Sequence, residues 1–151
     1  MRTAALTFAP AAVMLGAGPA AGTEGLLLQD GAYEVSVRLE LPHVEDTGVA
    51  ARLGRICVKA DGAGTRGLAA LGDGNPLRSC PASNVRHDGA ILTFDIVCPG
   101  GDGAVGAARY IVWAERFEGS IAVKMGGKNM TMLERQSGRR IGGCESVPPR
   151  S

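Results

Sequence analysis

YEVSVRLEL, residues 33–41, alternates apolar and polar side chains without a break. Its odd-numbered residues are tyrosine, valine or leucine, and its even-numbered residues are glutamate, serine or arginine. A period of two predicts a strand with one buried and one wet face. FEGSIAVKM, residues 117–125, repeats the pattern. Two such segments predict a sheet that is covered on one side only.

Turn residues divide the rest of the chain into short pieces. Asp-Gly dipeptides, which suit tight turns because both residues tolerate positive φ, begin at residues 30, 61, 73, 88 and 102. Further strands are predicted at 56–59, 92–96, 110–113 and 130–135. Thr65–Leu71 alone has a helical pattern, with Thr65 as its cap. The fold expected is an all-β antiparallel meander of roughly six to eight strands, closed or half-closed into a barrel, with one short helix.

The two ends of the chain lack the alternating pattern and are predicted to lie outside the β domain. Arg2, the uncharged run 4–17 and the small residues that follow have the three parts of a secretory signal, so residues 1–22 are predicted as a signal peptide. Cleavage after Ala20, Ala21 or Gly22 would satisfy the small-residue rule. A single β domain is then expected over 23–144. A disordered tail is expected over 145–151, which has two prolines and no apolar pattern.

Charge limits the partners that the sequence predicts. Without Arg2, 15 basic residues (16 − 1) face 15 acidic ones, so the mature chain is formally neutral. Neutrality predicts no binding to nucleic acid or to an anionic membrane surface. No later segment is long and apolar enough for a membrane span.

Four cysteines follow the predicted signal, at Cys57, Cys80, Cys98 and Cys144. An even count in an exported chain predicts two disulfides, for which three connectivities exist. Cys80 and Cys98 lie almost symmetrically about the Asp88-Gly89 turn, which favours Cys80–Cys98 and leaves Cys57–Cys144. Without C-x-x-C or clustered histidines, a zinc site is not expected.

The sequence holds no constellation typical of an enzyme. Residues 101–106 match G-x-G-x-x-G by letter, but the predicted strand 110–113 follows them where a dinucleotide site needs a helix. No cofactor is therefore expected. His43, His87 and the adjacent acids Glu45-Asp46 suggest no triad, and no G-x-S-x-G elbow is present. A non-enzymatic protein is predicted, with a small hydrolase as an alternative.

Met130 and Met132 carry two competing interpretations. Two thioethers two residues apart on a strand share a face, and soft sulfur ligands suit Cu(I), with Met125, Trp113 and a histidine as further ligands. Methionines also fill gaps in β cores. Met125 shares its row with Val123, so core packing is the prediction and a periplasmic copper-handling protein is an alternative.

The chain also resembles a bacterial secreted family known as domain of unknown function 3617. The resemblance rests on Gly31-Ala32-Tyr33-Glu34, the four spaced cysteines, Met130-Thr131-Met132 and the closing run Gly138–Cys144, and it covers residues 29–144. It implies a periplasmic or secreted location, and it implies no activity and no site residues. The function itself stays unknown at this point. For a non-enzymatic exported protein, the activity expected is binding of a small apolar ligand or of a protein partner.

Overall fold

Seven antiparallel strands form one continuous sheet in the computed structural model, which describes residues 28–42, 50–100, 103–126 and 130–147. The strands are β1 (Gly31–Glu40), β2 (Arg52–Val58), β3 (Ala82–Asp88), β4 (Ile91–Val97), β5 (Val105–Val112), β6 (Arg116–Met125) and β7 (Met130–Gly142). Their order across the sheet is β2-β1-β7-β6-β5-β4-β3. The predicted signal peptide, 1–22, lies outside the described residues.

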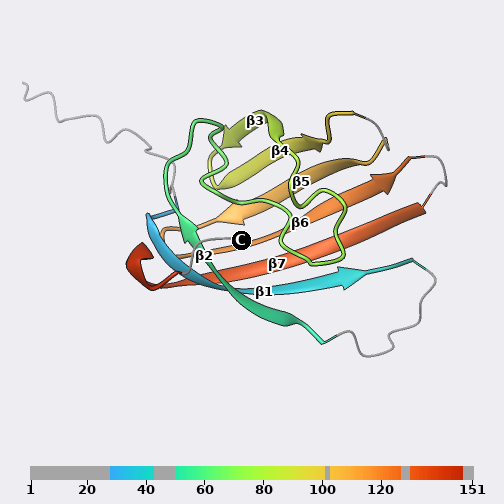
Figure 1. Cartoon of the computed structure of the whole chain (residues 1–151). Helices are drawn as coiled ribbons and strands as arrows, with labels where there is room; N and C mark the ends of the chain where they lie inside the picture. The colour runs from blue at the N-terminus through green and yellow to red at the C-terminus, as the bar shows by residue number, and fades with distance from the viewer. Residues whose placement is uncertain (1–27, 43–49, 101–102, 127–129, 148–151) are drawn as a thin grey trace, which may run out of the picture.

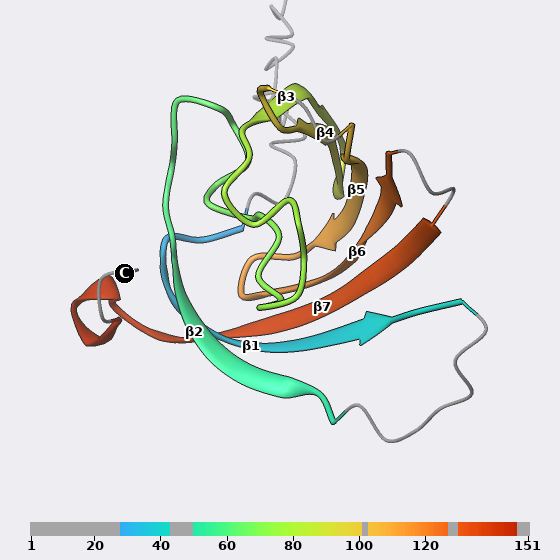
Figure 2. The ribbon, with the colours of Figure 1, turned by 45° about the vertical axis from the view of Figure 1, so that its right-hand side comes forward.

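The sheet curls strongly but does not close (Figures 1 and 2). Its order ends at β2 on one side and β3 on the other, and these two strands are not paired with each other. The all-β antiparallel meander is confirmed, whereas closure into a barrel is not found. In Figure 2, the long connection from β2 to β3 runs through the concave side of the sheet. We call this connection, residues 59–81, the crossover segment.

The helix predicted at Thr65–Leu71 is wrong. Arg66 and Gly67 have φ angles of 57° and 81°, in the left-handed region, where an α-helix cannot continue. The crossover segment is instead a succession of turns, and no α-helix occurs in the described part of the chain. Thr65 does take part in a cap-like contact, because its hydroxyl donates to the Asp61 carboxylate at 2.7 Å.

The concave face of the sheet carries the core. Four aromatic rings form a chain across it, with centroids 5.8 Å apart between Phe94 and Tyr110, 5.9 Å between Tyr110 and Phe117, and 6.0 Å between Phe117 and Tyr33. Such tilted and stacked pairs add to the energy of burial. The larger aliphatic side chains of the cluster come from the strands, from the crossover segment and from the residue Leu28 that precedes β1. They are Leu28, Val35, Val37, Ile56, Val58, Leu68, Leu77, Leu92, Ile96, Val112, Ile121 and Val123.

Two glycines make room for these rings. Gly119 on β6 lies opposite Tyr110, and a Cβ built on it would be 2.1 Å from the tyrosine ring. Gly138 on β7 lies opposite Phe117, and a Cβ there would be 2.3 Å from that ring. The predicted strand 130–135 therefore continues past Gly138 to Gly142, since this glycine supports a ring and does not break the strand.

Both disulfides are present, with Cys80 bonded to Cys98 and Cys57 bonded to Cys144. These are the pairs that the spacing about Asp88-Gly89 favoured. The first closes the base of the β3–β4 hairpin, and the second ties the chain after β7 to edge strand β2. Cys144–Ser146 form a single 3₁₀ turn, so residues 145 and 146 of the predicted tail, 145–151, belong to this turn. Residues 148–151 of the predicted tail lie outside the described residues.

Candidate functional site

A buried carboxylate fixes the crossover segment to the sheet. Glu134 of β7 is completely buried. It accepts hydrogen bonds from the backbone N–H of Leu71 (2.7 Å) and Gly72 (3.1 Å), and from the side-chain amides of Asn75 and Gln136 (both 2.6 Å). Four donors around one carboxylate satisfy the polarity that makes burial of a charge expensive. The turn at 71–75 is therefore held in one place.

Neighbouring amides extend this anchor along the crossover segment. The amide nitrogen of Gln136 also donates to the Ala69 carbonyl at 2.7 Å, and the Asn75 side-chain oxygen accepts from the Leu77 N–H at 2.9 Å. The charge of Glu134 also acts on Tyr110. Burial raises the pKa of the Tyr110 phenol, and the negative charge of Glu134 raises it further. Hydrogen bonds to Glu134 and Gln136 thus hold residues 69–77 against the concave face of β7.

The first part of the crossover segment is shaped by Asp61. Its carboxylate accepts from the Thr65 hydroxyl at 2.7 Å and from the Gly67 N–H at 2.8 Å. Partial burial alone would raise the pKa of this carboxyl, but these hydrogen bonds together hold the pKa below its ordinary value. The turn at 61–67 is therefore kept close to the sheet edge, where Gly67 lies against the Cys57 carbonyl.

A groove remains between this anchored segment and strands β1 and β2. We call it the β2 groove; its volume is about 820 Å³. Its floor is apolar, and Val35, Val37 and Ile56 supply it together with Leu39 and Leu71. A groove of this size is within the range of small-molecule sites. Its remaining lining residues are Ala50, Arg52, Leu53, Gly54, Arg55, Ala70, Gly72, Asp73, Gly74, Arg78 and Ser79.

Charged side chains stand at the rim of the β2 groove. Asp73 forms ion pairs with Arg52 and with Arg78, the latter at 2.8 Å. All three side chains are more than half exposed, so these pairs contribute little to stability. Two arginines against one aspartate leave this group with a single positive charge, and Arg55 adds a second positive charge to the groove lining.

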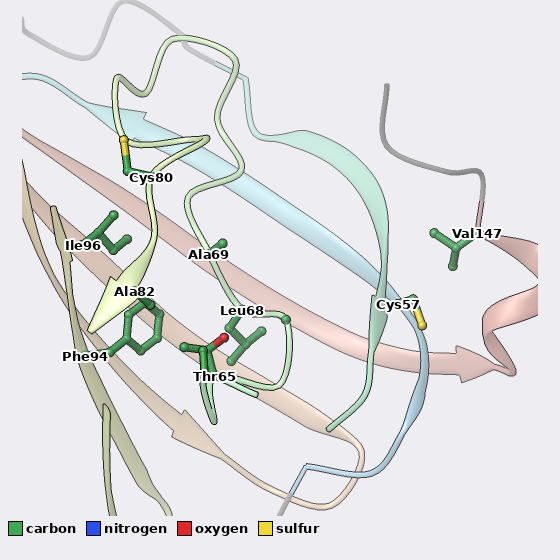
Figure 3. Close-up of a pocket in the computed structure, with 11 residues that line it drawn as sticks. Cys57, Thr65, Leu68, Ala69, Cys80, Ala82, Phe94, Ile96 and Val147 are labelled. Atoms are coloured by element: carbon green, nitrogen blue, oxygen red, sulfur yellow. The ribbon is translucent and has the colours of Figure 1, made fainter. Parts of the chain in front are cut away.

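A second, smaller hollow of about 420 Å³ lies between the two edges of the sheet (Figure 3). In the close-up, Cys57 and Val147 lie on one side and Phe94 and Ile96 on the other. Leu68, Ala69 and Thr65 of the crossover segment occupy the space between them. This edge hollow marks the position where a closed barrel would have joined β2 to β3.

The two methionines singled out by the sequence have different surroundings. Met132 faces Val123 on β6 and is 7% exposed, so core packing is correct for it. Met130 faces Met125 and is 47% exposed, so core packing is wrong for it. The reason is position, since Met130 is the first residue of β7 and lies at the end of the hairpin.

The other residues named by the sequence do not gather with these methionines. Trp113 lies beyond the other end of β6, about 30 Å along a ten-residue strand, where Arg116 stacks on its ring at 4.2 Å. His87 is exposed on β3, with its ring nitrogen 3.0 Å from the Gly64 carbonyl. His43 and Glu45-Asp46 lie outside the described residues.

The glycine-rich match at 101–106 opens a strand. Gly103 has a φ of 63°, and β5 begins at Val105, so a strand follows the glycines where a dinucleotide site needs a helix. Residues 101–102 themselves are not described. Elsewhere in the described chain, no group of three or more His, Cys, Asp or Glu side chains is placed to hold a metal ion.

Comparison with known proteins identifies a family and no activity. A family model described as "Protein of unknown function (DUF3617)" matches residues 28–144, from three residues before the first strand to the last cysteine. No curated protein and no solved structure matches the chain. Two disulfides fit an oxidising compartment. Among the described residues, no helix has the length and apolar character needed to cross a membrane.

Proposed function

We propose, from the premise that this chain belongs to the DUF3617 family of proteins of unknown function, that it is an exported binding protein without catalytic activity. Its ligand is a small molecule with an apolar body and an anionic end, and its site is the β2 groove. The predicted signal peptide, the resemblance to a secreted family and the two disulfides support a periplasmic or secreted location.

The apolar floor of the β2 groove carries this proposal. Val35, Val37 and Ile56 are buried in the sheet, yet they line an open groove of about 820 Å³ with Leu39 and Leu71. The rigid wall opposite is the turn held by Glu134. A preformed wall lowers the ordering cost of binding, because the protein need not fix a loop when the ligand enters.

The rim supplies the preference for an anionic end. Arg52 and Arg78 share Asp73, and a carboxylate or phosphate on the ligand would complete the neutralisation of this group. Ser79 is the one hydroxyl in the described lining, and no histidine lies there to activate it. This arrangement supports binding over the small-hydrolase alternative.

Titration with a fluorescent long-chain carboxylate tests the proposal. Gly74 lines the groove and is exposed, so Gly74→Trp places a bulky ring at its mouth. We expect at least a tenfold loss of affinity in Gly74→Trp, and no loss in the matched control Gly62→Trp, whose position has open space around it. Arg78→Ala should weaken binding of the carboxylate more than binding of the corresponding alcohol. Absence of binding by the unmodified protein, or equal binding by both tryptophan variants, would contradict the proposal.

One observation favours a second candidate, copper handling. Met125 lies directly opposite Met130, and Met132 is the next residue on the same face of β7, so three thioethers lie at one end of the β6–β7 hairpin. Opposed side chains in a sheet have Cβ atoms about 5 Å apart. Cu(I) titration under conditions that preserve the disulfides decides this: tight one-to-one binding that is lost in Met130→Leu would support a copper site. Equal weak binding by both forms would reject it.

A further inference from the structure

Four arginines from four different strands align in one row across the convex face of the sheet. The pairing of β1 with β7, β7 with β6, β6 with β5, β5 with β4 and β4 with β3 places six residues side by side in the order Arg38, Arg135, Ser120, Arg109, Thr93 and Arg86. We call this set the arginine row. All four arginines are exposed, and the two hydroxyl residues between them are half-buried.

The spacing of the row follows from sheet geometry. Neighbouring strands are about 4.8 Å apart, so the row measures roughly 24 Å from Arg38 to Arg86. Arg135, Arg109 and Arg86 stand on alternate strands, roughly 10 Å apart, with a hydroxyl between each pair. The row therefore runs perpendicular to the strands, as a line of cations separated by small polar groups.

Few arginines of the row form an ion pair. Arg135 pairs with Glu40 at 2.7 Å, whereas Arg38, Arg109 and Arg86 form no ion pair with any described residue. Arg38 and Arg135 lie directly opposite each other, and like charges in that position destabilise a sheet. An anion lying along the row would remove that repulsion.

The surface along the row is hollowed. One shallow hollow of about 600 Å³ is lined by Arg38, Arg135, Ser120 and Arg109. A second of about 390 Å³ is lined by Arg109, Thr93 and Arg86. Three acids also line them, Glu40 and Glu118 in the first and Asp95 in the second, so the row keeps one positive charge in excess. Arg109 belongs to both, so the two hollows adjoin. Small residues, among them Gly119 and Ala107, contribute to the depth. Together the hollows contain every member of the arginine row.

We propose that the arginine row binds an acidic polysaccharide lying across the strands. The planar guanidinium groups of arginine suit two-point recognition of carboxylate, sulfate or phosphate groups, and the hydroxyls of Ser120 and Thr93 suit sugar hydroxyls. An extended flexible chain can follow the convex face and contact every arginine of the row, whereas a flat membrane would contact only the middle of the row.

The row lacks the features of a nucleic-acid site for single strands. Such sites stack bases on aromatic side chains. Here the described rings are either buried on the concave face, as for Tyr110 and Phe94, or lie beyond the end of β5, as for Trp113. Phe94 is the one aromatic residue that lines either hollow among the described residues, and it is 2% exposed with its ring stacked on Tyr110, so it offers a base no free ring face.

Binding to immobilised polyuronate, with neutral dextran as a blank, tests this inference. We expect binding that weakens steeply with salt and falls at least tenfold in Arg38→Gln/Arg109→Gln. The matched control is Arg52→Gln/Arg78→Gln, which removes the same charge from the rim of the β2 groove and should bind polyuronate nearly as well as the unmodified protein. The long-chain carboxylate should still bind to Arg38→Gln/Arg109→Gln, which separates this surface from the groove.

Three results would overturn the inference. One is no binding to polyuronate or to dextran sulfate at low salt. Another is equal weakening by both double variants, which would indicate general charge attraction. The last is tighter row-dependent binding to single-stranded DNA or to vesicles containing an anionic lipid, which would assign the surface to another class of partner.

Discussion

The two faces of the sheet carry glutamates with opposite surroundings. Glu134 on the concave face of β7 is buried and accepts four hydrogen bonds, whereas Glu118 on the convex face of β6 is exposed to solvent. The first organises a loop of another part of the chain, and the second lines a charged hollow. The same alternation of residues along a strand thus produces a structural carboxylate on one side and a surface charge on the other. What distinguishes them is the crossover segment, which covers only the concave side.

The largest effect should come from removing the buried glutamate. Glu134→Ala leaves four donors without their acceptor, at about 1 kcal/mol or more each, so we expect a loss of about 4 kcal/mol in the free energy of unfolding. Glu118→Ala should change it by less than about 0.5 kcal/mol. Urea denaturation of both variants measures the difference. Similar losses in the two would mean that the crossover segment is not held by Glu134.

The methionines offer the same contrast with apolar side chains. Met132→Ala should cost about 3 kcal/mol, within the range of large-to-small changes in a core, because Met132 is buried against Val123. Met130→Ala, at an exposed position, should cost less than about 1 kcal/mol. Met132→Leu nearly conserves volume and should cost under about 1.5 kcal/mol. Thermal unfolding of the three variants checks this order, and a larger loss for Met130 would reverse the assignment of faces at this end of β7.

Two glycines, one packed against a ring and one with open space at its Cβ position, provide a third comparison. Gly138→Ala drives a methyl group into the Phe117 ring and should cost about 2 kcal/mol through overpacking. Gly54→Ala, in β2 with open space at its Cβ position, should be neutral or slightly stabilising. Chemical denaturation with the two variants side by side is the measurement. A tolerated alanine at 138 would show that the Phe117 ring can move aside.

The smallest effect is expected from alkaline pH. Burial raises the pKa of Tyr110 above its ordinary value, so above about pH 10 its phenol ionises in the unfolded chain and stays neutral in the folded one. Stability should therefore fall as pH rises above 10, by roughly 1 kcal/mol one unit above that value. Tyr110→Phe should weaken this dependence at little cost near neutral pH, since the hydroxyl has no hydrogen-bond partner in the described structure. Urea denaturation between pH 8 and 11 tests this, and an unchanged slope in Tyr110→Phe would contradict it.

Local patterns in the sequence were sufficient for most of the fold. The alternation at 33–41 and 117–125 predicted β1 and β6, and the Asp88-Gly89 turn favoured the disulfide that closes the β3–β4 hairpin. The crossover segment was the main error. Its path depends on left-handed angles at Arg66 and Gly67 and on a carboxylate more than sixty residues away, and neither leaves a periodic signal.

The candidate binding surfaces were beyond the reach of sequence patterns for a related reason. The β2 groove exists because the sheet stays open and the crossover segment covers only part of β1 and β2. The arginine row joins Arg38 to Arg135, which become neighbours only through the pairing of β1 with β7. A formally neutral composition also gave no hint that four arginines would align on one face.

The order of the strands imposes an order of assembly. β7 is the last strand to be synthesised, yet it lies between β1 and β6 and joins the β1–β2 hairpin to the β3–β6 meander. Until it arrives, β1 and β6 each expose an unpaired edge, and such edges readily recruit strands from other chains. Cys144 follows β7 by two residues, so its bond to Cys57 can lock the two halves together only once the sheet is complete. A chain that ends before β7 should therefore aggregate. Formation of the Cys57–Cys144 disulfide, in turn, indicates that the sheet has been completed.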